Sequence, residues 1–76
     1  MDEKEKKLKL YYSQVLELIK SYEGKTLIGK LVANRQDVRN AYIKKAGDLL
    51  LKMVEMDESS SYVEDARRNL LLISRS

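Results

Sequence analysis

The chain lacks cysteine, histidine, proline, tryptophan and phenylalanine among its 76 residues. Without cysteine, disulfide bonds and thiolate metal sites are excluded. Without histidine, the commonest general base and the commonest metal ligand are also missing. The reactive groups that remain are carboxylates, tyrosines, lysines and hydroxyls, and the densest carboxylates fall where a loop or a first helical turn is expected. We therefore predict a protein that is not an enzyme, with no catalytic residues, no metal site, no cofactor and no small-molecule substrate.

The chain also lacks a long apolar run. Its longest run, residues 70–73, is far shorter than the roughly 20 residues that span a bilayer. The first residues mix acids and lysines, unlike a secretory signal peptide. These features predict a cytoplasmic protein with no membrane partner.

The composition favours helices. Apolar residues make up 43% of the chain and charged residues 36%, with only three glycines. A composition this poor in turn residues is typical of a helical protein rather than a strand-rich one. We expect one all-α domain, residues 1–76, built as a small bundle of three to four helices. Because so short a chain forms only a small core, we also expect a homo-oligomer or a hetero-protein partner.

Apolar spacing predicts a first helix over residues 2–23. Positions 8, 11, 15, 18 and 22 alternate by three and four, which marks one helical face. Four further apolar residues widen this face: Leu10, Tyr12, Leu16 and Ile19. Either the helix is central in the bundle, or these four residues form a second face for another chain.

The middle of the chain has two interpretations. Residues 26–33 have the spacing of a short helix, and Asn34 followed by Asp37 fits an N-cap with an acidic third residue. We therefore predict a break there and a new helix from Arg35, which continues through Gly47. The alternative is one long helix over residues 26–56. The short helix would place Leu27, Ile28, Leu31 and Val32 on one side, and the next helix would turn Val38, Ala41, Tyr42, Ala46, Leu49, Leu50, Met53 and Met56 inward.

Residues 57–60 are predicted to form a polar loop before the last helix. Ser61 with Glu64 fits a capping box that starts this helix, over residues 62–74. Its inward residues would be Val63, Ala66, Leu70 and Ile73. Because successive helical residues are 100° apart, the run 70–73 surrounds most of the helix and not all of it can face one core. The candidate protein-interface residues are therefore Leu10, Tyr12, Leu16, Ile19, Leu71 and Leu72.

The charge is concentrated in the middle of the chain. Residues 24–52 hold seven basic and two acidic side chains, a local net charge of +5. Residues 1–23 have a net charge of 0, and residues 53–76 have a net charge of −2. A basic segment between neutral and acidic ends indicates an anionic partner, either nucleic acid or an acidic protein surface. The alternative is that the basic side chains form a solvated face with no partner.

Residues 28–41 resemble a helix-turn-helix DNA-binding motif. Gly29 would be the small packing residue of its first helix, and Leu31 and Val38 would be buried. The outward face of its recognition helix would offer Gln36, Arg39, Asn40 and Lys44, whose side chains suit base readout. Without that motif, the basic side chains could still contact phosphates without sequence preference. The candidate nucleic-acid-binding residues are Lys30, Arg35, Gln36, Arg39, Asn40, Lys44 and Lys45.

Three functions are compatible with these features. The favoured hypothesis is a helical accessory or adaptor protein that binds a protein partner through apolar helix faces, while its basic middle contacts nucleic acid or an acidic surface. The first alternative is a helix-turn-helix transcriptional regulator that binds DNA as a dimer. The second alternative is a purely protein-binding inhibitor or antitoxin-like factor, which has no need of the basic segment.

Overall fold

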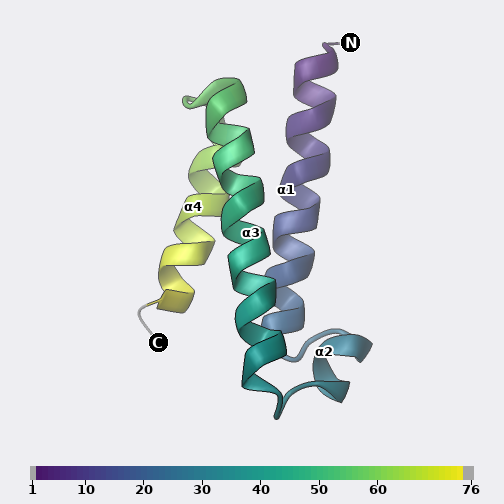
Figure 1. Ribbon diagram of the computed structural model, residues 1–76. Coiled ribbons are helices and arrows are strands. Elements are labelled where there is room, and N and C mark those ends of the chain that lie inside the picture. Colours follow the sequence, from purple (N-terminus) through teal and green to yellow (C-terminus); the bar gives the residue numbers. More distant parts are fainter. Residues whose placement is uncertain (1, 75–76) are drawn as a thin grey trace.

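The computed structural model describes residues 2–74, and every regular element in that range is a helix (Figure 1). The order is α1 (Glu3–Tyr22), α2 (Leu27–Leu31), α3 (Gln36–Asp57) and α4 (Ser61–Ser74). Figure 1 shows α1 and α3 side by side along most of their length, with α4 packed against both and the five-residue α2 projecting at one end. The predicted all-α class is confirmed.

Polar residues define both ends of α1. The side chain of Asp2 accepts a hydrogen bond from the backbone amide of Lys4 at 3.0 Å, which satisfies one of the free N-terminal amides. After the helix, Gly24 has a φ of +76°, a left-handed conformation that favours glycine. The prediction of a helix over residues 2–23 is therefore confirmed, with Asp2 acting as its cap.

A turn separates α2 from α3. The hydroxyl of Thr26 caps α2 by accepting a hydrogen bond from the amide of Gly29 at 3.0 Å. Beyond α2, the amide of Arg35 donates to the carbonyl of Val32 at 2.8 Å and closes the turn. The predicted break is confirmed, and the alternative of one helix over residues 26–56 is wrong.

The start of α3 differs from the prediction by one residue. Its cap is Arg35 rather than Asn34, and no side chain caps the helix. The closed turn holds Arg35 at φ −100° and ψ 86°, so helical geometry begins only at the next residue. Asp37 lies in the first turn, where its carboxylate pairs with the Arg35 guanidinium at 3.2 Å instead of completing a cap.

The second half of α3 and the start of α4 follow the sequence closely. The helix passes through Gly47 without a break, as predicted. The cap of α4 is shifted by one residue, because the hydroxyl of Ser60 rather than Ser61 accepts a hydrogen bond from the Tyr62 amide, at 3.2 Å. Glu64 instead lies 3.9 Å from the guanidinium of Arg68, in the next turn of the same helix.

The core lies between α1, α3 and α4. Its most completely buried large side chains are Val15, Met53 and Val63, one from each helix. The full set of buried apolar residues is Leu8, Val15, Ile19, Ala46, Leu49, Met53, Val63 and Ala66. One residue predicted to face inward, Ala41, is exposed. It lies 100° around α3 from its half-buried neighbour Tyr42.

Candidate docking surface at the α2 end of the bundle

Gly29 holds α2 directly against α1. It is buried, and a Cβ atom at this position would lie 2.9 Å from the Cα atom of Ser21 and closer still to the Ser21 carbonyl oxygen. The Ser21 hydroxyl also forms a hydrogen bond of 2.9 Å with the hydroxyl of Thr26. The glycine side of α2 therefore faces the bundle, and only glycine permits so close an approach of the two backbones.

The orientation of α2 leaves its large apolar side chains in solvent. Leu27 is 77% exposed, Ile28 61% and Leu31 72%. The predicted burial of Leu31 is therefore wrong, because Gly29 occupies the inward position on this short helix. We refer to Leu27, Ile28 and Leu31 together as the α2 apolar surface. Exposed apolar residues that gather on one element, rather than scatter singly, are a mark of interaction sites.

Three of the candidate nucleic-acid-binding residues bind one another. The guanidinium of Arg39 donates to the side-chain oxygen of Gln36 at 2.8 Å, and the amide of Gln36 donates to the side-chain oxygen of Asn40, also at 2.8 Å. The Arg39 guanidinium also donates to the backbone carbonyl of Tyr22 at 3.2 Å and lies 4.5 Å from the centre of its ring. Arg39 thus fastens the start of α3 to the end of α1.

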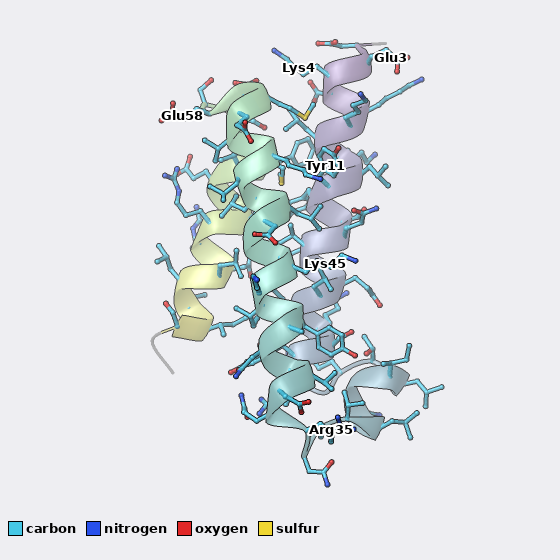
Figure 2. The ribbon with its side chains drawn as sticks, viewed as in Figure 1. Glu3, Lys4, Tyr11, Arg35, Lys45 and Glu58 are labelled. Carbon is cyan, nitrogen blue, oxygen red and sulfur yellow. The ribbon has the colours of Figure 1, made fainter. Side chains whose placement is uncertain are left out.

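The remaining basic candidates divide into one paired and three unpaired residues. The Arg35 guanidinium donates two hydrogen bonds to Asp37, at 3.2 and 3.3 Å, and these lower the pKa of that carboxyl below its ordinary value. Lys30, Lys44 and Lys45 are exposed and form no ion pair with any residue that the structure describes. Arg35 lies at the same end of the bundle as α2 (Figure 2).

Three of the candidate protein-interface residues are exposed: Leu10 at 55%, Leu71 at 50% and Leu72 at 60%. Leu16 is half-buried, and Ile19, with only 6% of its surface exposed, belongs to the core. The prediction of a second, partner-facing position for Ile19 is therefore wrong, because α4 covers this side of α1.

Tyr12 was also predicted to face a partner, and the structure places it against α4. Its ring centre lies 5.1 Å from that of Tyr62, and its hydroxyl donates a hydrogen bond to the carboxylate of Asp65. This hydrogen bond, together with burial and the negative charge of Asp65, raises the pKa of Tyr12 above its ordinary value. Tyr12 is thus half-buried against α4 rather than turned fully outward, and its place in a protein interface stays a prediction.

The sequence prediction missed the α2 apolar surface as a functional candidate. A signal was present, since a central glycine in a short apolar helix marks either a close backbone contact or a weak helix. The spacing of the apolar residues indicated a buried face equally well, so the sequence alone did not distinguish inward leucines from an inward glycine. Leu51 of α3 was also missed; it is 63% exposed.

Two further properties concern metals and membranes. No group of three histidine, cysteine, aspartate or glutamate side chains within residues 2–74 is placed to hold a metal ion. Among the helices of the same range, none combines the length and the apolar character that crossing a bilayer requires.

Comparisons of the chain with protein-family models, with curated proteins and with solved structures found no match.

Proposed function

We propose that the chain is a non-enzymatic accessory or adaptor protein that binds an acidic protein partner through the α2 apolar surface. The observation that carries this proposal is that α2 is held by Gly29 with Leu27, Ile28 and Leu31 turned to solvent. Burying the exposed parts of these three side chains against a partner would contribute roughly 3–6 kcal/mol of binding free energy. This is enough for the surface to be an anchor of an interface.

The unpaired lysines of α2 and α3 support an acidic partner. Lys30 belongs to α2 itself, and Lys44 and Lys45 lie in the first half of α3, all three without an ion pair among the described residues. Exposed charges at the rim of an interface steer an oppositely charged partner and suppress like-charged ones. Phosphates would be attracted as well, but a nucleic-acid backbone offers no apolar surface for the leucines. The apolar residues therefore favour protein over nucleic acid.

Photo-cross-linking tests the proposal. A photoreactive residue replaces Leu31 in the chain expressed in its source organism, and a second variant carries the same residue at Leu51, which has a similar exposed fraction but lies on α3. We expect the Leu31 probe to cross-link a protein with an acidic surface and the Leu51 probe to give little of that product. Absence of a protein product at Leu31, or equal yields from both positions, would contradict the proposal.

The second candidate is a helix-turn-helix regulator that binds DNA as a dimer. It is favoured by the order of α2 and α3 and by the exposed polar side chains of Gln36 and Asn40 in the first turns of α3. It is supported less well than the first because α2 contacts α1 and Arg39 is held by Tyr22. A regulator predicts that Asn40→Ala reduces affinity for one duplex sequence, whereas phosphate contact alone predicts that Lys44→Ala weakens every sequence equally.

A purely protein-binding inhibitor or antitoxin-like factor is the third candidate. It uses the same apolar surface and needs no contribution from the lysines. For such a factor, replacing Lys30 and Lys44 by alanine would leave the affinity for the cross-linked partner unchanged. For the adaptor proposed here, the same variant binds its acidic partner more weakly and with less dependence on salt.

A further inference from the structure

A surface hollow lies beside α2, where α2 meets the two long helices. Its volume is about 420 Å³. Clefts of about 300–1,000 Å³ take in small ligands, so this hollow has room for several side-chain atoms of another molecule. We refer to it as the α2 hollow. Its lining residues come from α1, α2 with its cap, and α3: Glu17, Ser21, Thr26, Leu27, Ile28 and Tyr42.

The charge of the α2 hollow is negative. Of its six lining residues, only Glu17 is charged. Glu17 is exposed and forms no ion pair with any residue that the structure describes. The other lining side chains are apolar or carry a hydroxyl group. The hollow therefore suits an apolar group that has a positive charge beside it, and it repels an acidic one.

The α2 helix itself carries this combination of groups. Leu27 and Leu31 are one turn apart and share a side of α2, and Lys30 directly precedes Leu31. Lys30 is exposed and, like Glu17, forms no ion pair within the described part of the chain. In Figure 1, α2 projects at one end of the bundle, away from α4. An apolar projection with a positive charge thus adjoins an apolar hollow with a negative charge, and such a surface is complementary to itself.

We propose that two copies of the chain associate around a two-fold axis, with α2 of each copy seated in the α2 hollow of the other. Leu31 of one copy would enter the hollow, and Lys30 would pair with Glu17 of the second copy. Because a two-fold axis repeats every contact, two such ion pairs would form. The net charge of +3 on each copy opposes association. Salt screens charges more than about 8 Å apart at physiological ionic strength, so the groups in direct contact decide the outcome.

Such a dimer would regulate access to the α2 apolar surface. Its leucines are covered in the dimer, so an acidic protein partner binds only to a chain that has left the dimer. Raising the concentration of the chain would then weaken the apparent affinity for the partner. This regulatory role rests on the proposed function, whereas the dimer itself does not.

Sedimentation equilibrium of the purified chain and its charge-swapped variants tests this inference. We expect the mass to rise from one copy toward two as the protein concentration is raised to about 1 mM. Lys30→Glu and Glu17→Lys each bring like charges together at the contact, so each should weaken association by about threefold or more. The double variant Lys30→Glu Glu17→Lys restores opposite charges and should associate as tightly as the wild type.

Lys9→Glu is the matched control for these variants. It changes the net charge by the same amount as Lys30→Glu, but Lys9 is an exposed residue near the other end of α1. We expect Lys9→Glu to change the association little. Circular dichroism of every variant establishes that the comparison is between folded proteins. In the ¹⁵N-labelled wild type, the amides of Leu31 and Tyr42 should shift as the concentration rises.

Each other outcome overturns the inference. A mass of one copy at about 1 mM would show that no dimer forms. A dimer that both single variants leave unchanged, or that the double variant fails to restore, would show that Lys30 and Glu17 do not meet. A mass that grows beyond two copies would exclude a closed two-fold contact.

The Leu31 cross-linking experiment decides the proposed function separately. A product with an acidic protein, from a chain that sediments as a monomer, would overturn the dimer and leave the proposed function standing. A product that contains only two copies of the chain would support the dimer and contradict the proposed function.

Discussion

Replacing Gly29 by alanine perturbs the contact that orients α2. The added Cβ would lie 2.9 Å from the Cα of Ser21 and nearer still to its carbonyl oxygen, both of which are backbone atoms that cannot rotate away. If α2 stays in place, overpacking of this kind costs about 1–3 kcal/mol. If α2 moves away, it loses the hydrogen bond between Ser21 and Thr26, worth about 1 kcal/mol, and its contacts with α1.

Alanine also has an intrinsic advantage over glycine in a helix, of about 1 kcal/mol, which offsets part of either cost. We therefore expect Gly29→Ala to lower the free energy of unfolding by about 1–2 kcal/mol. For a domain of this size, that corresponds to a fall in Tm of about 4–16 °C. Urea unfolding followed by circular dichroism measures the free energy, and amide hydrogen exchange in α2 and at the end of α1 shows whether the loss is local.

Gly47→Ala is the matched control for this prediction. Gly47 lies in the middle of α3, and a Cβ atom there would meet no other atom within 4 Å outside its own helical turn. The same substitution should therefore stabilise the protein by up to about 1 kcal/mol. The reasoning is refuted if Gly29→Ala is as stable as Gly47→Ala and leaves the amide exchange of α2 unchanged, since α2 would then not rest on the backbone of Ser21.

Three further variants test other contacts. Met53→Ala removes a side chain with 0% exposure and should cost about 2–5 kcal/mol, seen as a large fall in the urea midpoint; a loss below about 1 kcal/mol would contradict its central place in the core. Tyr12→Phe removes the hydrogen bond to Asp65 and should cost about 1 kcal/mol at neutral pH. Because the pKa of Tyr12 is raised in the folded protein, the contribution of Tyr12 to folding stability is fully present below the unfolded pKa near 10. That contribution is lost as the pH rises through the folded pKa. The stability of the wild type should therefore fall more steeply above pH ~10 than that of the variant. Arg39→Lys keeps the charge but loses the planar contact with Tyr22, so thermal unfolding should show a loss of about 1 kcal/mol; unchanged stability would indicate that Arg39 does not anchor α3.

Periodicity predicted the long helices of this fold because each buries a continuous apolar face. Val15, Met53 and Val63 lie at positions whose neighbours repeat by three and four, and all three are buried as expected. Errors in the helix bounds were confined to helix ends, where a single turn decides the cap, and one residue predicted to face inward, Ala41, is exposed. Arg35 rather than Asn34 precedes α3 because of a backbone hydrogen bond to Val32 that no residue pattern encodes.

The site was harder to predict than the fold. A five-residue helix is too short for periodicity to show which face turns inward. Here the close backbone contact of Gly29 places the glycine inward and leaves the leucines of α2 exposed. Tyr12 and Ile19 were assigned to a partner because the spacing within α1 cannot show where α4 lies. The excess of basic residues was visible in the sequence, but the hydrogen bonds that hold Arg39 depend on a carbonyl of α1, 17 positions earlier in the chain.

The most direct test of the central claim, that α2 presents its leucines to solvent for a partner, is the unfolding free energy of the double variant Leu27→Ser Leu31→Ser. Because both side chains are more than 70% exposed, we expect stability within about 0.5 kcal/mol of the wild type. A loss of more than about 2 kcal/mol, typical of leucines removed from a core, would show that these residues hold the fold together and would contradict the claim.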